Sequence, residues 1–423
     1  MIYEIFIFVA SLLGRIASVY NRKARKFFSL RKGEIDRIEE YFRNNPGNRV
    51  IWFHSASAGE FEQAKPIIEY LKKDREEIRI VASFFSPSGF EAGIKYREID
   101  LCFNLPLDYR RNIKRLLNCI KPEIIIYSKY DIWHNLSTLA NRRDIKLIMI
   151  SATIPESSLR HRFPFRIFFS RTYGLFCRIY AISKEDALRF IRIIGRGKKG
   201  IVIISGDTRF DRVKTVLKKK PIAMTDMILR DKEHQYIIAG STYEVSENKL
   251  LNVAMRLRDG GEKAIFILVP HEVDSENIDR IKENIKSRGF MPIIYSKSKD
   301  PILLKEEEML IVDVQGVLAY LYEIADIVFI GGSFKGSVHS VLEPAIFGKP
   351  ILTGPFIKNA FEAISLKDIG GLSVCRNEDE LYKMIKTLMD DKLRNNMSKR
   401  VKEYFNENLG ACRYIIHDMK KFI

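Results

Sequence analysis

Residues 50–60 read Val-Ile-Trp-Phe-His-Ser-Ala-Ser-Ala-Gly-Glu, and this stretch decides the fold. The first half of the stretch is an apolar run that predicts a buried parallel strand. The small residues that follow, with Gly59 available for an unusual backbone turn, predict a short loop into a helix that begins near Glu60. A strand, a small-residue loop and a helix make up the repeating unit of doubly wound α/β domains.

Apolar runs and amphipathic segments continue to alternate along the chain, in two consecutive sets. The strands predicted from the first set are Val50–His54, Ile80–Phe84, Ile124–Tyr127, Leu147–Ile150, Ile179–Ile182 and Val202–Ile204. A lysine-rich segment that contains a proline, residues 214–222, interrupts the alternation and predicts a linker. The strands predicted from the second set are Tyr236–Ala239, Ile265–Val269, Pro292–Tyr295, Leu310–Val312, Ile327–Ile330 and Ile351–Leu352.

Two such sets predict an α/β protein with two Rossmann-like, doubly wound domains that face a cleft, preceded by an N-terminal membrane-anchoring helix. We expect the anchoring helix and its basic flank in residues 1–32 and the first domain in 33–213. The second domain is expected in 223–400, after the linker. Residues 401–423 are expected to form a helix that crosses back to the first domain.

The N-terminal segment is apolar from Ile5 to Leu13, and Arg15 then interrupts the run. A basic cluster follows between Arg22 and Lys32. Since a membrane span needs about 20 apolar residues, the segment predicts a helix that lies in the membrane interface, or a short anchor with its basic flank on the cytoplasmic side. The alternative is an N-terminal helix docked on the core.

The composition narrows the classes of partner and cofactor. The chain has 423 residues and a formal net charge of +18, which favours a polyanionic partner such as a nucleic acid, an anionic membrane or a phosphorylated substrate. Its five cysteines are scattered, which argues against a disulfide framework or a structural zinc site. Its seven histidines lack metal-ligand spacing. We expect neither a bound metal nor a cofactor.

Glu60 is the first candidate for chemistry, because it falls near a strand end and the start of a helix. The positive end of the helix dipole stabilises an ionised carboxylate there, so Glu60 could act as a general base. The alternative from the local sequence is a glutamate that only caps the helix.

Three loops in the second set follow strands and suit a nucleotide. Residues 240–242 are Gly-Ser-Thr, residues 270–271 are Pro-His, and residues 331–333 are Gly-Gly-Ser. Backbone amides at such loops and at helix N-termini can hold phosphate. A helix predicted near His339 brings in Glu343, whose carboxylate could accept hydrogen bonds from a ribose.

Several basic residues are further candidates. Arg209 follows the strand Val202–Ile204 and could reach a phosphate or a sugar carboxylate, or could lie in a solvated turn. Lys129 follows another strand, close to Trp133, which is expected to be a packing residue. The stretch 161–171 interleaves aromatic and basic side chains, which suits either a membrane interface or a buried helix face.

Together these segments resemble the Kdo transferase family, whose members add 3-deoxy-D-manno-octulosonic acid (Kdo) to lipid A. The most specific piece is residues 52–60, Trp-Phe-His-Ser-Ala-Ser-Ala-Gly-Glu. Residues 206–211, 240–244, 270–271 and 331–343 match in the same order. The resemblance covers nearly the whole chain.

The resemblance implies a GT-B fold and a metal-independent, inverting transfer of Kdo from CMP-Kdo to the 6′-hydroxyl of a lipid A precursor. It implies that Glu60 is the catalytic base. The residues expected to bind the donor are Arg209, Gly240, Ser241, Thr242, Pro270, His271, Gly331, Gly332, Ser333, His339 and Glu343. Those expected to bind the acceptor are Ser57, Gly59, Lys129, Arg162 and Arg166.

The resemblance also implies a location on the cytoplasmic face of the inner membrane of a Gram-negative cell, where lipopolysaccharide is made. Two other readings of the sequence remain open. Another GT-B enzyme, such as a UDP-sugar transferase or epimerase, would share the fold and the glycine loops. A nucleic-acid-binding protein would account for the charge, but the sequence contains no known nucleic-acid-binding motif, and we expect no nucleic acid as partner.

Overall fold

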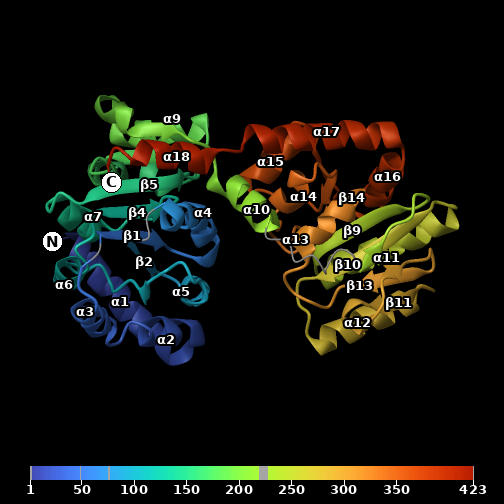
Figure 1. Ribbon diagram of the computed structural model, residues 1–423, viewed down its shortest axis with the longest axis horizontal. Helices are drawn as coiled ribbons and strands as arrows, with labels where there is room; N and C mark the ends of the chain where they lie inside the picture. The colour runs from blue at the N-terminus through green and yellow to red at the C-terminus, as the bar shows by residue number, and fades with distance from the viewer. Residues whose placement is uncertain (1, 48, 75–76, 219–226, 423) are drawn as a thin grey trace. The chain divides into compact units, whose positions relative to one another are not determined.

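The computed structural model describes residues 2–47, 49–74, 77–218 and 227–422. The chain divides into two compact units (Figure 1). Unit 1 comprises residues 1–212 together with 409–423, and unit 2 comprises residues 213–408. Each unit contains its own parallel sheet with helices on both faces.

The sheet of unit 1 is parallel throughout, in the order β3-β2-β1-β4-β5-β6-β7. Its strands are β1 (Arg49–Ser55), β2 (Ile78–Phe84), β3 (Leu101–Asn104), β4 (Ile124–Ser128), β5 (Lys146–Ala152), β6 (Arg178–Ala181) and β7 (Val202–Ile204). Every strand expected from the first set is confirmed, and β3 is an additional edge strand. The strand order reverses between β1 and β4, the position at which doubly wound sheets bind ligands beyond their carboxyl ends.

The two faces of this sheet bury separate cores. Side chains alternate along β1, so Val50 and Trp52 join one core, while Ile51 and Phe53 join the other. The helices of unit 1 are α1 (Ile2–Tyr20), α2 (Arg22–Ser29), α3 (Glu34–Asn44), α4 (Ala58–Asp74), α5 (Pro87–Ile94), α6 (Arg110–Ile120), α7 (His134–Asn141), α8 (Phe165–Tyr173), α9 (Lys184–Ile194) and α18 (Ala411–Met419). Burial on both faces accounts for the near-continuous apolar runs that predicted the strands.

Unit 2 repeats this architecture in the order β11-β13-β10-β9-β14-β15-β16. Its strands are β9 (Gln235–Thr242), β10 (Ala264–Pro270), β11 (Met291–Ile294), β13 (Glu308–Ile311), β14 (Ile327–Ile330), β15 (Ile351–Thr353) and β16 (Leu372–Val374), with a small separate pair β8 (Ile228–Leu229) and β12 (Ile302–Leu303). Its helices are α11 (Glu244–Asp259), α12 (Ser275–Lys286), α13 (Leu318–Leu321), α14 (Leu342–Ile346), α15 (Phe361–Asp368), α16 (Glu378–Leu388) and α17 (Asp391–Glu407). The strand order reverses between β9 and β14.

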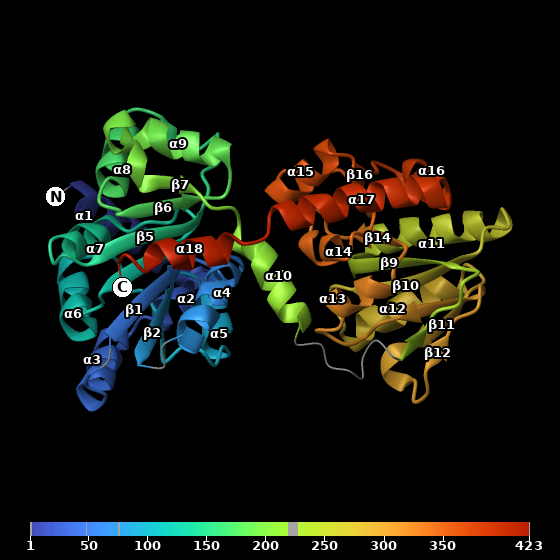
Figure 2. The ribbon, with the colours of Figure 1, turned by 45° about the horizontal axis from the view of Figure 1, so that its top comes forward.

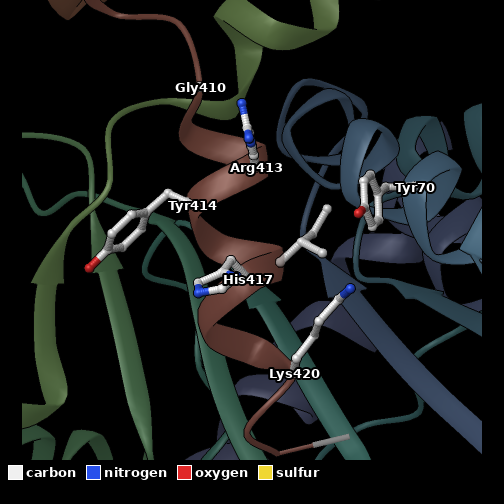
Figure 3. Close-up of a pocket in the computed structure, with 7 residues that line it drawn as sticks. Tyr70, Gly410, Arg413, Tyr414, His417 and Lys420 are labelled. Atoms are coloured by element: carbon white, nitrogen blue, oxygen red, sulfur yellow. The ribbon is translucent and has the colours of Figure 1, made fainter.

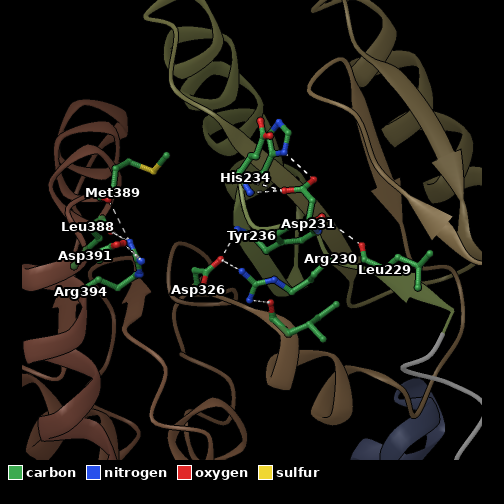
Figure 4. Close-up of polar contacts among 12 residues, drawn as sticks. Leu229, Arg230, Asp231, His234, Tyr236, Asp326, Leu388, Met389, Asp391 and Arg394 are labelled. Carbon is green, nitrogen blue, oxygen red and sulfur yellow. Dashed lines mark hydrogen bonds and ion pairs between the residues drawn. The ribbon is translucent and has the colours of Figure 1, made fainter.

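Polar contacts hold unit 2 together at the edge opposite to these carboxyl ends (Figure 4). The carboxylate of Asp326 accepts the backbone N–H of Tyr236 at 2.8 Å and pairs with Arg230 at 2.7 Å. The Arg230 guanidinium also lies 4.7 Å from the centre of the Tyr236 ring. Arg394 donates to the backbone oxygens of Leu388 and Met389, which closes the end of α16. The contacts of Asp326 join β9 to the start of β14 and leave the carboxyl ends of both strands for a ligand.

The boundaries between the units differ from those expected. Helix α10 (Thr208–Lys218) runs through the first half of the expected linker, and residues 219–222 lie outside the described residues. The expected boundary at 401 falls inside α17, because that helix continues to Glu407. The segment that returns to unit 1 is therefore α18, where Asp418 pairs with Arg178 at 2.9 Å and accepts the hydroxyl of Tyr180. Figure 2 shows α18 beside α4 on one face of the sheet.

Candidate functional site

Glu60 lies in the first turn of α4, directly beyond the carboxyl end of β1. The side chain is mostly buried, with 8% of its surface exposed. Its Oε2 accepts the backbone N–H of Ala56 at 2.6 Å, and the hydroxyl of Ser57 accepts the N–H of Glu60 at 3.4 Å. This reciprocal pattern is a form of the capping box. Glu60 therefore does cap its helix, and the same contacts fix the orientation of its carboxylate.

The surroundings of Glu60 raise its pKa. Burial is the main cause, and the nearby carboxylate of Asp131 adds to it. The N–H of Ala56 and the ammonium of Lys129 act in the opposite direction. Lys129 and Asp131 follow β4, the strand beside β1 at the point where the order reverses. Glu60 is therefore a carboxylate of increased basicity at the ligand-binding position of a doubly wound sheet.

The turn before Glu60 leaves room for another molecule. Gly59 adopts a helical conformation in α4, so our expectation that it permits an unusual backbone turn is wrong. A Cβ atom built on Gly59 would meet no atom within 4 Å among the residues that the structure describes. Gly59 therefore leaves open space at its own position, one residue before Glu60. Of the expected acceptor residues, Ser57, Gly59 and Lys129 are thus brought together around Glu60.

Arg162 and Arg166 lie apart from this group. Both side chains are exposed, Arg162 just before α8 and Arg166 in its first turn. Arg160 is nearer the site, because its guanidinium lies 4.7 Å from the centre of the Tyr130 ring and counteracts the burial that raises the pKa of Asp131. Arg160 precedes the stretch 161–171, so the sequence analysis did not include it, and the role of Arg162 and Arg166 in binding the acceptor stays a prediction.

His54 belongs to a buried hydrogen-bonded chain that sequence reasoning missed. Its Nε2 accepts the indole N–H of Trp133 at 2.9 Å, so the proton of the neutral ring must be on Nδ1, which donates to the Ser83 hydroxyl at 2.8 Å. The indole of Trp52 donates to the same hydroxyl at 2.7 Å. Burial lowers the pKa of His54 to about 3. The neutral imidazole holds the ends of β1 and β2 against the loop that follows β4.

The second group of candidates lies beyond the carboxyl ends of β9, β10 and β14 in unit 2. Ser241 has a φ of +52°, in the left-handed region. A Cβ on Gly331 would lie 2.1 Å from the carbonyl oxygen of Ser241, and a Cβ on Gly332 would lie 2.4 Å from that of Ser337. Only glycine fits at these two positions. The close packing of these loops builds a cradle of backbone groups at the strand ends.

Aromatic and basic side chains line one side of this cradle. His271 stacks on His339 at 4.7 Å between ring centres and on Tyr243 at 5.0 Å. The ammonium of Lys335 lies 4.5 Å from the centre of the Tyr243 ring. Burial, with the neighbouring His271, lowers the pKa of His339. The four residues form a flat, cation-bearing surface, which we call the imidazole stack. Tyr243 and Lys335 were missed, although each adjoins a motif that the sequence analysis used.

Other expected donor residues are engaged within the protein. The hydroxyl of Ser333 contacts that of Thr353 at 2.8 Å and accepts the N–H of Gly354, and Thr242 donates to Glu247 at 2.9 Å. Gly240 makes room for the hydroxyl of Tyr322, and Pro270 lies at a bulge of β10. In unit 1, Arg209 pairs with Asp207 at 2.7 Å. Glu343 lies half-buried in the first turn of α14. These side chains shape the loops, so contacts to a phosphate would come from backbone groups.

Two further features of the described residues bear on the choice of site. Within those residues, no group of three or more His, Cys, Asp or Glu is placed to hold a metal ion.

A separate hollow of about 420 Å³ lies beside α18, with Tyr70 of α4 on one side and Tyr414 projecting from the other side of the helix (Figure 3). Its walls come from α4 and α18 and include none of the groups around Glu60. It is a surface feature separate from the candidate site.

Comparison with known proteins gives the chain its relatives. Residues 30–212 match the family model described as 3-deoxy-D-manno-octulosonic-acid transferase (kdotransferase). A 3-deoxy-D-manno-octulosonic acid transferase from Rickettsia bellii is 26% identical over 96% of this chain and 91% of its own length. The chain is similar to Kdo transferases over most of its length. The segment that matches the family model contains Glu60, His54 and Lys129, while the relatives extend the match through the imidazole stack in unit 2.

Two further comparisons extend this similarity to other proteins. A protein from Fusobacterium nucleatum called a bifunctional glycosyltransferase/methyltransferase is 24% identical over 88% of this chain, and the chain spans 57% of that protein's length. The solved structure of UDP-GlcNAc 2-epimerase from Neisseria meningitidis aligns with a TM-score of 0.61 and 15% identity, over 88% of this chain and 100% of that one. The fold of the chain is GT-B, with two parallel doubly wound sheets, as expected.

Proposed function

We propose that the protein is a glycosyltransferase that moves Kdo from CMP-Kdo to the 6′-hydroxyl of a lipid A precursor, with inversion at the anomeric carbon. The observation that carries the proposal is the Glu60 carboxylate: buried, raised in pKa and oriented by the N–H of Ala56, beside open space at Gly59. It lies in the segment that matches the Kdo transferase model. A base of this kind is what an attacking sugar hydroxyl requires.

In the proposed reaction, Glu60 takes the proton from the acceptor hydroxyl as that oxygen attacks the anomeric carbon of Kdo, and CMP leaves. The raised pKa makes Glu60 a stronger base than a free glutamate. Lys129, whose ammonium interacts with Glu60, is available to orient a phosphate or hydroxyl of the acceptor. No metal is needed for these steps.

The donor is proposed to bind at the carboxyl ends of β9, β10 and β14. The backbone cradle around Ser241 and Gly332 offers N–H groups to the phosphate of CMP. The imidazole stack beside it offers flat faces and the cation of Lys335 to a donor that carries a phosphate and a sugar carboxylate. Transfer requires the donor and the acceptor to be bound at the same time.

The acceptor side of the proposal includes a membrane. Helix α1 is long and apolar enough, by length and composition, to cross a bilayer, and most of its large apolar side chains are exposed. Its apolar surface and the net charge of +18 suit an anionic bilayer on the cytoplasmic face of the inner membrane. A lipid substrate with phosphates would be drawn to the same surface.

The test is the transfer of Kdo by Glu60→Gln, measured as product mass from CMP-Kdo and an acylated, bisphosphorylated glucosamine disaccharide. We expect the variant to fold and to lose at least about a hundredfold in rate, because general-base catalysis contributes about that much or more. The matched control is Glu62→Gln, two residues along α4, where the side chain pairs with Lys65 and Arg212. If Glu60→Gln transfers as fast as this control, the mechanism is wrong.

A second candidate is a UDP-sugar enzyme, since the solved neighbour that shares the fold is a UDP-GlcNAc 2-epimerase. The two candidates differ in the nucleotide that unit 2 binds. Saturation-transfer NMR with CMP and with UDP separates them, because the proposal requires CMP to give the stronger signal. His339→Ala is the variant to use as the reference, since it removes one face of the imidazole stack and is expected to weaken that signal.

A further inference from the structure

A second cavity in unit 1, of about 890 Å³, lies between α1, α2 and the start of α5. Its walls are almost entirely apolar and include Phe6, Ala10, Phe27, Phe85 and Trp133. The volume is in the range of protein pockets that enclose a ligand. Of the two acidic side chains in the wall, Asp108 has its carboxylate occupied by the Tyr3 hydroxyl and by the N–H groups that begin α7, and Glu91 pairs with Lys26.

The floor of this cavity is joined to the candidate active site by two short routes. Along the first, the N–H of Ser86 donates to the carbonyl of Ala56 at 2.8 Å, and the N–H of Ala56 donates to Glu60. Along the second, Phe85 packs on Trp133 with 4.8 Å between ring centres, and Trp133 donates to His54. The same strand ends therefore build both the floor of the cavity and the seat of the base.

The outer wall of the cavity is the apolar helix α1. Phe6, Ala10 and Gly14 face the cavity at intervals of four residues, on one side of the helix. Phe8 and Leu12 lie on other sides of the helix, with 59% and 49% of their surface exposed. A helix that is apolar all round is either buried or in a membrane. A bilayer around α1 would therefore bring hydrocarbon chains next to the wall of the cavity.

The inner wall is held in place by Arg31. Its guanidinium lies 3.5 Å from the centre of the Phe27 ring and donates to the backbone oxygens of Phe85 and Leu105 at 2.6 and 2.9 Å. The exposed end of the cavity carries Lys23 and Lys26, of which Lys26 pairs with Glu91. An apolar interior with a cationic margin matches a lipid whose acyl chains are attached to a phosphorylated head group.

We infer that this cavity receives one acyl chain of the lipid acceptor and thereby presents the sugar of that acceptor to Glu60. The inference rests on the proposed function and adds the part of the substrate that it recognises. Binding energy from a remote chain of the substrate is used to orient the reacting hydroxyl. Phospholipid acyl chains from the bilayer are the competing occupant, and the experiments below distinguish the two.

The first experiment uses the fluorescence of Trp133, one of two tryptophans in the chain. Trp133 lines the cavity, whereas Trp52 is fully buried in the core of unit 1. The full-length protein is mixed with vesicles of ordinary phospholipid that contain an acceptor with brominated acyl chains. We expect saturable quenching that is lost in Trp133→Phe. Quenching only when the bromine is on the phospholipid, or no quenching at all, would overturn the inference. Since no transfer is measured, this result stands even if the proposed reaction fails.

The second experiment fills the cavity from its walls. Ala10→Phe on α1 and Ala24→Phe on α2 place a large ring inside it without adding a tryptophan, while Ala17→Phe makes the same change on α1 outside the lining. We expect the first two variants to lose the bromine quenching and to raise KM for the acylated acceptor about tenfold. The control should retain both parent values. All three should bind vesicles equally, because α1 stays apolar.

The outcomes separate the cavity from the reaction itself. If the parent protein transfers Kdo and both filled variants match the control in KM and in quenching, the inference is wrong while the proposed function stands. If the parent transfers no Kdo, the proposed function is wrong and the quenching experiment alone decides what the cavity binds. Two filled variants are used so that a folding defect in one, seen by circular dichroism, leaves the other to decide.

Discussion

Glu60 has two roles at the level of single residues: it caps α4, and it is the proposed base. Burial and Asp131 raise its pKa, so the carboxylate becomes protonated at a higher pH than a free glutamate, whose pKa is about 4.3. Since only the ionised form accepts a proton, kcat/KM for transfer should fall as the pH drops through the raised pKa.

The neighbours of Glu60 provide the control for this pH profile. Asp131→Asn removes a charge that raises the pKa of Glu60, so the acidic limb should move to lower pH. Lys129→Met removes a charge that lowers it, so the limb should move to higher pH. An acidic limb that stays fixed in both variants would show that another group controls the reaction.

His54 gives a prediction about stability. The folded protein holds its pKa near 3, whereas a free histidine titrates near 6.5, so the unfolded chain binds the extra proton as the pH falls. Below pH 6.5 this group therefore destabilises the fold, by about 2–3 kcal/mol at pH 4.5. His54→Gln keeps a donor and an acceptor but cannot titrate. Urea unfolding at pH 7.5 and 4.5 should show a smaller loss of stability in the variant than in the parent.

The sequence predicts the position and role of Glu60 but not the role of His54. Glu60 is found by local signals, because a strand, a small-residue loop and a helix start are contiguous in residues 50–60. The role of His54 depends on Ser83 and Trp133, which lie 29 and 79 positions away. No local pattern encodes those contacts. The pairing of β1 with β2 and β4 creates them, and it becomes visible only in the folded sheet.

At the level of elements, strands with a strong local signal were predicted and strands with a weak local signal were not. Central strands such as β1 and β9 are buried on both faces and appear as long apolar runs. The strands missed in the two large sheets, β3 and β16, are short edge strands with a single neighbour, and the two-residue strands β8 and β12 of the separate pair were missed as well. The glycine loops at 240 and 331 were placed correctly at strand ends. The stacking of His271 on His339 was not foreseen, because it joins the segment after β10 to the segment after β14.

Helix α1 is also longer than the apolar run predicted, since it continues past Arg15 to Tyr20. We expect a protein that starts at Arg22 to lose most of its flotation with liposomes and to keep its fold by circular dichroism. A protein that starts at Gly33 also loses Arg31, which donates to Phe85 and Leu105, and should melt at a lower temperature than the first truncation. Undiminished flotation of both would contradict the anchor.

At the level of the whole molecule, the net charge of +18 acts together with α1. Charge attraction to an anionic surface weakens as salt shortens the Debye length from about 8 Å at physiological ionic strength to about 3 Å at 1 M. The full chain should therefore stay partly bound to anionic vesicles at 1 M salt, because the apolar contact of α1 persists. The protein that starts at Arg22 should be released completely. Sedimentation of both proteins with vesicles across this range of salt separates the contribution of charge from the contribution of α1.

The path of the chain through the molecule has one more consequence. The carboxylate of Asp211 accepts the N–H groups of Gly410 and Cys412 at 2.9 and 2.8 Å, so the departing and returning segments of unit 1 meet at a single carboxylate. Unit 2 is thus an insertion with adjacent ends. Joining residue 212 to residue 409 through a short bridge would give unit 1 as one continuous chain, small enough for isotope labelling, without unit 2.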